Sequence, residues 1–80
     1  MKSNYSLRIE YEENEVFVQE FYTTRRKIEK VFYDLAFLIP DGDIHRVAIY
    51  LRHDSTKVSF NNRYELINEA FRHGEVSHVQ

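Results

Sequence analysis

Residues 5–11 read YSLRIEY and residues 16–22 read VFVQEFY, and these two stretches decide the fold of the first half of the chain. In the first stretch apolar and polar side chains alternate, which is typical of a strand with one buried face. The second stretch is rich in strand-forming residues, and the polar residues 12–15 separate the two. The sequence therefore predicts a hairpin. Its second strand carries apolar side chains on both faces, which predicts a strand covered on both sides or an outer face that meets a partner.

A helix is expected after the hairpin. Thr23 or Thr24 suits its N-cap, and it is expected to run to about Ile39, where Pro40 ends it. The turn at residues 40–43 then leads into residues 44–53, whose alternation predicts a third strand. The apolar face of the helix follows the i, i+4, i+7, i+11 spacing and comprises Ile28, Phe32, Leu35 and Ile39.

The second half is expected to repeat this order of elements. Residues 58–60 are the expected fourth strand, and Asn62 with Glu65 resembles a capping box for a second helix that stops at Gly74. The apolar stripe of this expected helix comprises Leu66, Ile67, Ala70 and Phe71. The fold class predicted is α+β: one small ββαββα domain over residues 1–80, with a four-stranded antiparallel sheet and two helices packed on one face. Residues 1–4 and 75–80 are expected to be flexible tails, with a short added strand as the alternative for residues 75–80.

Composition limits the classes of function. Hydrophobic residues make up 42% of the 80 residues and aromatic residues 15%, which suits a packed core rather than a disordered chain. There is no cysteine, so a disulfide framework and a thiolate zinc site are excluded. The net charge of −2 gives no whole-molecule attraction for nucleic acid or an anionic membrane. We expect a cytoplasmic protein that does not enter a membrane.

Surplus aromatic surface is the first candidate site. The rings of Phe17, Phe21, Tyr33 and Phe37 exceed what a small sheet and two helices are expected to cover, so they predict a protein-binding surface or a homodimer. The sheet face opposite the helices is expected to add Arg46, Tyr50 and Arg52 as anchors for a partner. The alternatives are half-buried flank residues for the rings and cross-strand ion pairs for the arginines.

A basic cluster at the start of the first expected helix is the second candidate site. Positive side chains at a helix N-terminus oppose the helix dipole, which makes this end suited to a phosphate or an acidic loop. The alternative is a solvated face whose charges are balanced by Glu20, Glu29 and Asp34. The cluster comprises Arg25, Arg26, Lys27 and Lys30.

Catalytic and metal-binding motifs are not found. The chain has no nucleophile motif and no glycine-rich loop, and Asp41, Asp43 and His45 are explained by turn and strand-end chemistry. We expect no enzyme, no cofactor and no metal. In size and composition the chain resembles small, mildly acidic, cysteine-free accessory and inhibitor proteins of phages and mobile elements. The function expected is a non-catalytic protein-binding module, such as an inhibitor or adaptor; the alternative is a nucleic-acid or phosphate-binding domain.

Overall fold

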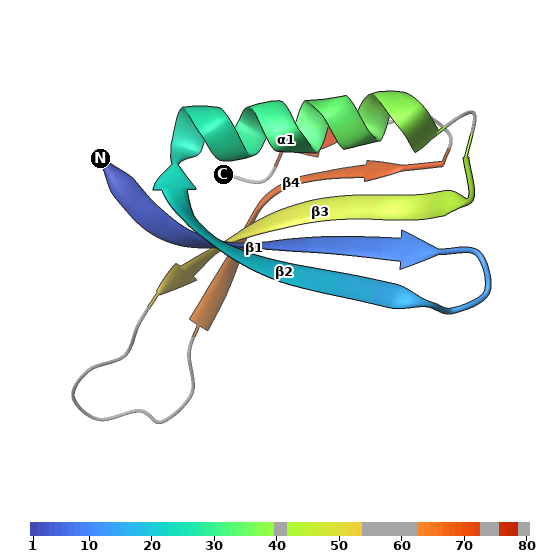
Figure 1. The fold of residues 1–80 in the computed structure, drawn as a ribbon, viewed down its shortest axis with the longest axis horizontal. Coiled ribbons are helices and arrows are strands. Elements are labelled where there is room, and N and C mark those ends of the chain that lie inside the picture. Colours follow the sequence, from blue (N-terminus) through green and yellow to red (C-terminus); the bar gives the residue numbers. More distant parts are fainter. Residues whose placement is uncertain (40–41, 54–62, 73–75, 79–80) are drawn as a thin grey trace.

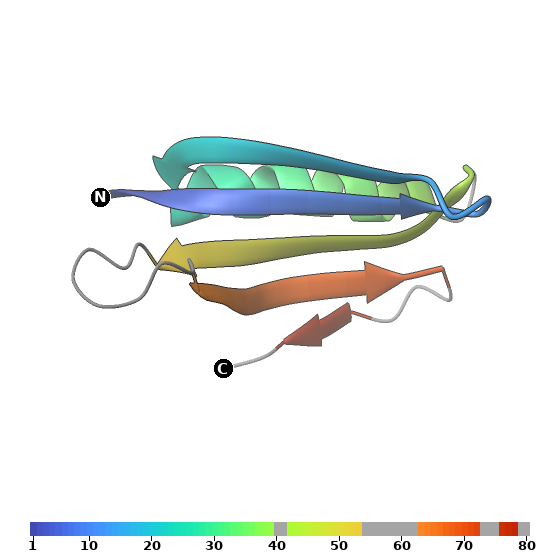
Figure 2. The ribbon, with the colours of Figure 1, turned by 90° about the horizontal axis from the view of Figure 1, so that it is seen from below.

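The computed structural model describes residues 1–39, 42–53, 63–72 and 76–78, which form one antiparallel sheet with one helix on one of its faces (Figure 1). Within these residues no helix is long and apolar enough to cross a membrane. The spatial order of the strands is β2-β1-β3-β4-β5, and all neighbours are antiparallel (Figure 2). In chain order the elements are β1 (Lys2–Tyr11), β2 (Val16–Thr24), α1 (Arg25–Leu38), β3 (Ile44–His53), β4 (Arg63–Phe71) and β5 (Val76–His78).

The predicted hairpin is confirmed as β1 and β2. Its tight turn places Asn14 at φ 61°, in the left-handed region that asparagine tolerates better than most residues. The Tyr11 N–H donates a hydrogen bond to the Glu15 carbonyl at 2.8 Å, which closes a three-residue loop. β1 begins at Lys2, which pairs with Thr24, so residues 2–4 are part of a strand although they were expected in a tail.

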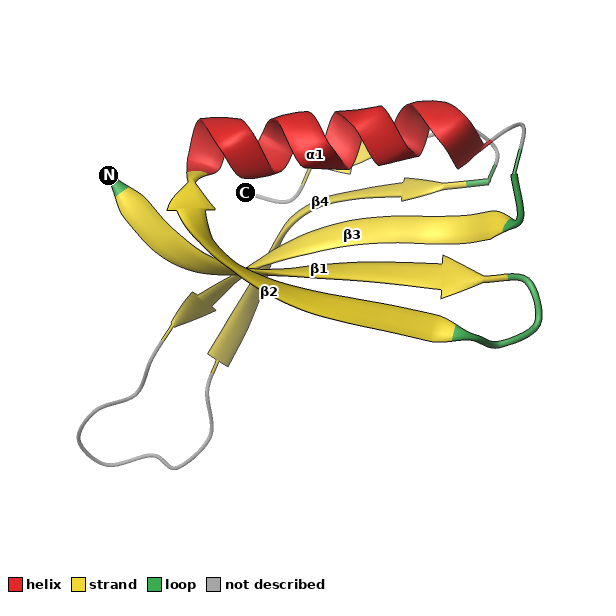
Figure 3. Ribbon diagram, in the orientation of Figure 1, coloured by secondary structure: helices red, strands yellow, loops and turns green. Residues whose placement is uncertain are grey.

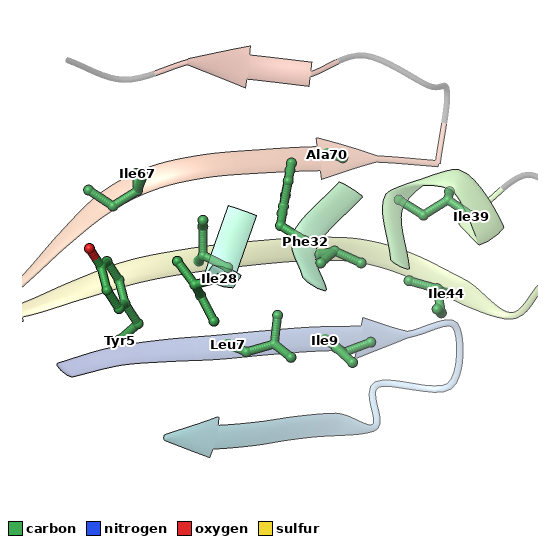
Figure 4. Packing of buried hydrophobic residues seen from close by; sticks show 11 residues of the cluster. Tyr5, Leu7, Ile9, Ile28, Phe32, Ile39, Ile44, Ile67 and Ala70 are labelled. Carbon is green, nitrogen blue, oxygen red and sulfur yellow. The ribbon is translucent and has the colours of Figure 1, made fainter. Parts of the chain in front are cut away.

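The first predicted helix is also confirmed. The Thr24 hydroxyl accepts a hydrogen bond from the Lys27 N–H at 3.3 Å, as expected of an N-cap residue. Ile28 and Phe32 are both 0% exposed, and they lie against the sheet (Figure 4). After the helix, the Gly42 N–H donates to the Ile39 carbonyl at 3.4 Å, and the chain enters β3.

One core lies between the helix and the sheet. The central strands β1 and β3 place their inward side chains directly opposite one another, with Leu7 beside Ile49 and Ile9 beside Val47. All four side chains are buried. Because one face of each central strand is sealed in this way, a slip of one residue in their pairing would expose the whole set, so the hydrophobic pattern fixes the register.

The second predicted helix is wrong, because residues 63–71 form the strand β4 (Figure 3). The apolar residues 66, 67, 70 and 71 had the spacing of a helical stripe, but they belong to both faces of a strand that contains a β-bulge. Asn68 pairs with Ile49 and Leu66 with Tyr50, so Ile67 is the extra residue of the bulge. Ile67 joins the core, as Asn68 and Ala70 do on the same buried face.

In residues 1–39, 42–53, 63–72 and 76–78, the predicted ββαββα repeat is therefore replaced by a sheet of four long strands and the short β5, with one helix. The expected strand at residues 58–60, the cap at Asn62 and the stop at Gly74 lie outside the described residues. With only one helix to bury, the sheet keeps its opposite face uncovered by any described element (Figure 1). We refer to this as the open face.

Two phenylalanines of α1 provide a test of this packing. Phe32 is 0% exposed and Phe37 is 81% exposed. We expect Phe32→Ala to lower the free energy of unfolding by about 3–5 kcal/mol, because the substitution leaves a cavity in the core. Phe37→Ala is the matched control, with an expected effect within about 0.5 kcal/mol. Urea unfolding followed by circular dichroism measures both, and equal losses would show that α1 does not face the sheet through Phe32.

Candidate functional site

Strand β2 carries more exposed large hydrophobic residues than any other described element. It contains four of the nine exposed large hydrophobic residues of the described chain, with exposed fractions of 45–67%. These four residues line an outer strand of the sheet, next to β1 only. We call them the β2 edge surface; they are Val16, Phe17, Val18 and Tyr22.

The backbone of β2 presents hydrogen-bonding groups to the free edge. The Tyr11 N–H donates to the Glu15 carbonyl, so the odd-numbered residues of β1 direct their backbone N–H and C=O groups toward β2. In agreement, the even-numbered Glu12 N–H donates to the Asp43 carbonyl at 3.0 Å, on the β3 side. Because such bonds alternate along antiparallel strands, Val18 and Glu20 direct their N–H and C=O groups outward.

Structural devices that protect exposed edges are missing from β2. Natural sheets block an edge with lysine, proline, a bulge or a very short strand. β2 has nine residues without lysine or proline, and its register with β1 runs unbroken from Thr24 to Val16. Its one charged side chain is Glu20. Among the described residues, therefore, β2 is a long, apolar and unprotected edge.

The open face is hollowed beside this edge. A depression of about 320 Å³ lies at Ser6, whose small side chain leaves space between its larger neighbours. Tyr50 and Tyr64 meet edge to face at 6.5 Å between ring centroids. Since two of the lining residues belong to β2, the depression adjoins the free edge. We call it the open-face pocket; its lining residues are Ser6, Arg8, Val18, Glu20, Tyr50 and Tyr64.

Arg46 organises the rest of the open face. Its Nη1 donates to Glu10 Oε2 at 2.7 Å, and its Nη2 donates to Glu69 Oε2 at 2.7 Å and to the Tyr50 hydroxyl oxygen at 2.9 Å. The guanidinium carbon also lies 5.7 Å from the centroid of the Phe71 ring. With 14% of its side chain exposed, Arg46 is committed to neighbours within the sheet.

The contacts of this network shift the pKa values of Glu10 and Arg46. Burial by itself raises the pKa of the Glu10 carboxyl, but hydrogen bonds and charge from Arg46 and Arg8 outweigh burial, so the pKa lies below its ordinary value. Burial by itself lowers the pKa of Arg46, but hydrogen bonds with Tyr50, Glu69 and Glu10 outweigh burial and raise it. Glu10 and Arg46 are therefore both charged at neutral pH, and their pairing stabilises the open face.

The residues predicted for protein binding are distributed over three places. Phe17 lies on the β2 edge surface, whereas Phe21 is half-buried and packs against the core. Tyr33 and Phe37 lie together on the helix flank near β4, because the Asn68 amide on that strand donates to the Tyr33 hydroxyl at 3.4 Å. On the open face lie Arg46 and Tyr50, which interact with each other, and Arg52, which lies 3.8 Å from Glu20.

The predicted anion-binding cluster lies at the start of α1. Arg25 pairs with Glu29 at 3.4 Å, and Lys30 pairs with Asp34 at 3.0 Å. Arg26 and Lys27 are exposed, and neither side chain has an ion-pair partner in the described ranges. Half of the cluster therefore has the local balance that the solvated-face alternative predicts.

Metal-binding groupings are not seen among the described residues, where no three histidine or acidic side chains gather in a suitable way. Asp43 and His45 are exposed at the start of β3, and Asp41 lies outside the described residues. His53 contacts Glu65 at 2.9 Å on the neighbouring strand. The described histidines are thus placed as strand-end residues.

Several residues of the site were missed by sequence reasoning. Val16, Val18 and Tyr22 were assigned to a strand, but nothing in the sequence indicated that this strand is an edge. Tyr64 and Glu69 were missed because they were placed in or near a helix. A strand assignment alone would have put Tyr64 and Glu69 on opposite faces, because they are five residues apart; the bulge at Ile67 brings both to the face that carries Arg46.

The Arg46 network predicts a pH-dependent stability. A lowered folded-state pKa means that the unfolded chain binds more protons, so the contribution of Glu10 is full above about pH 4.5 and is lost as pH falls through the folded-state pKa. At pH 7 we expect Arg46→Met to lower the free energy of unfolding by about 1.5–3 kcal/mol, as for hydrogen bonds to charged groups.

Urea unfolding at several pH values measures this effect. The loss caused by Arg46→Met is expected to shrink as the pH falls below about 4.5. Lys30→Met is the control, because the exposed Lys30–Asp34 pair contributes about 0.3–0.5 kcal/mol. A loss for Arg46→Met that is no larger than that of the control would show that the network does not stabilise the sheet.

Comparisons with known proteins assign no residue roles in this chain. No protein-family model, no curated protein and no solved structure matches this chain. The roles of its residues are therefore inferred from their own geometry and chemistry.

Proposed function

We propose that this chain is a non-catalytic protein-binding module whose partner adds a strand to the free edge of β2. The observation that carries the proposal is the coincidence of two features on one strand: outward backbone N–H and C=O groups, and four exposed apolar side chains. In strand addition the backbone bonds provide affinity, and pockets for side chains provide specificity. The open-face pocket beside Val18 supplies such a recess.

The geometry of the open face supports this location over the arginines named from the sequence. The hydrogen-bonding groups of Arg46 are directed to Glu10, Glu69 and Tyr50, so a partner would have to break existing bonds to use them. Among the described residues, the side chains of the β2 edge surface make no hydrogen bonds that a partner would break; their one polar neighbour is the Lys2 ammonium, 5.8 Å from the centroid of the Tyr22 ring. An inhibitor or adaptor is the kind of protein that such a surface suits, and a cytoplasmic location is part of this proposal.

Peptides selected from a random library against the immobilised protein, held at low density, test strand addition. We expect the selected peptides to protect the Val18 and Glu20 amides from hydrogen exchange, because these N–H groups point to the free edge. The Gln19 and Phe21 amides serve as internal controls, because they already bond to β1. Val18→Pro removes one outward N–H while suiting an edge strand, and we expect it to weaken binding about tenfold.

Phe37→Ser is the matched surface control, because Phe37 is exposed on the helix flank near β4, away from the β2 edge. Binding that is equally weakened by Phe37→Ser and Val18→Pro would place the partner elsewhere. Failure to select any peptide that protects the outward amides would contradict the proposed function.

Nucleic-acid titration separates this proposal from the basic-cluster alternative. We expect no salt-dependent binding of single- or double-stranded DNA or RNA, because Arg25 and Lys30 are already paired with Glu29 and Asp34. Phosphate contacts would instead make log affinity fall with log salt by about 0.7–0.9 per contact. Such a slope, removed by Arg26→Gln together with Lys27→Gln, would favour the nucleic-acid function.

A further inference from the structure

We propose that the strand added to β2 is β2 of a second copy of this chain, in an antiparallel register with Gln19 on a two-fold axis. This inference rests on the proposed function, because it names the partner of the same edge. In this register Phe17 lies opposite Phe21 of the second copy, Val16 opposite Tyr22 of the second copy, and Val18 opposite Glu20 of the second copy.

The order of side chains along β2 selects this arrangement. Large apolar residues occur at both ends, in the pairs Val16-Phe17 and Phe21-Tyr22, and the polar Gln19 lies at their centre. An antiparallel copy therefore brings apolar groups together at both ends, and cross-strand pairs of aromatic rings stabilise a sheet. A sequence with apolar residues at one end only would not match itself in this way.

Charge disfavours the register with Glu20 on the two-fold axis. If one β2 slid along the other by two residues, Glu20 would lie on the axis, directly opposite Glu20 of the second copy. Like charges directly opposite one another are destabilising. With Gln19 on the axis, Glu20 lies beside Val18 of the second copy instead. Glu20 is the only charged residue of β2. The register with Gln19 on the axis therefore avoids the one like-charge contact that two copies of this strand could make.

The backbone is compatible with the same register. Val18 and Glu20 direct their N–H and C=O groups outward, and in this register each faces the other in the second copy. Gln19 then forms a pair without direct hydrogen bonds, where the two Cα atoms are about 4.5 Å apart. The two-fold axis stands perpendicular to the sheet, so both helices lie on one side of a continuous sheet.

The helix contributes to the same interface. Tyr33 marks the β4 flank of α1 through its contact with Asn68. Leu38 lies about 140° around the helix from Tyr33, which places it on the β2 flank. It is 51% exposed and lies at the end of α1 that is above the start of β2 (Figure 1). Pairing of the edges therefore brings the exposed apolar flank of each helix toward the seam.

The open-face pockets also meet at this seam. Val18 and Glu20 line the pocket of one copy and face Glu20 and Val18 of the second copy in the proposed register. The two depressions thus lie on either side of the axis, on the face opposite the helices. A dimer would present one continuous hollow where each single copy has a separate one.

Single cysteines test the register, because the natural chain has none. Under mild oxidation we expect Gln19→Cys to form a disulfide-linked dimer about tenfold faster, or more, than Lys30→Cys on the exposed face of the helix, since pairing raises the effective concentration of the two thiols. The close Cα spacing at residue 19 suits a disulfide. Faster linkage of Glu20→Cys than of Gln19→Cys would overturn the register.

Sedimentation of the cysteine-free protein tests the occupant. We expect a concentration-dependent dimer. Val18→Pro should raise its dissociation constant about tenfold to hundredfold, because a symmetric dimer loses each backbone bond twice. Phe37→Ser should dimerise like the natural chain. A monomer at all concentrations, together with slow disulfide formation in Gln19→Cys, would show that the partner strand is not a second copy. The proposed function would still stand in that case if library peptides protect the Val18 and Glu20 amides. If the protein neither dimerises nor selects peptides that protect these amides, both the dimer and the proposed function are overturned.

Discussion

In the part of the chain that the structure describes, a single helix on a five-stranded sheet is the constraint on which the other features depend. One helix covers a strip of about 10 Å, so it seals the central strands but cannot cover a whole sheet. Ile28 and Phe32 therefore lie over the inner strands, and the core consists of the side chains beneath them. The helix does not cover the outer edge of β2 or the open face of the sheet. The surfaces available for function are those that the helix leaves uncovered.

The uncovered open face is stabilised by polar contacts rather than by a second layer. Arg46 holds carboxylates from β1 and β4 together across β3, and its guanidinium group lies over the Phe71 ring. Such a network keeps an exposed sheet face well ordered without apolar cover. It also uses up the groups that would otherwise recognise a ligand there. The polar centre of the face is thus structural, and the apolar border at β2 is the part still available to a partner.

Sequence reasoning succeeded where pattern and local chemistry agreed. Alternation in residues 5–11, a capping threonine at residue 24 and the helical spacing from Ile28 to Ile39 each indicated an element that the structure contains. It failed at residues 63–71, because a bulge at Ile67 shifts the alternation and produces the spacing of a helix. The basic cluster and the aromatic residues were identified from the sequence, but their grouping on the surface was not.

By itself the sequence determined the local elements of the first half: the hairpin, the helix and the strand that follows it, since these depend on the periodicity and capping of neighbouring residues. It also determined that cysteine chemistry plays no part. Only the tertiary structure decided that β2 is an edge, that Arg46 meets Glu10 and Glu69, and that one pocket joins four strands. These features depend on strand order and register, which arise from contacts between residues far apart in the chain and leave no local period to detect.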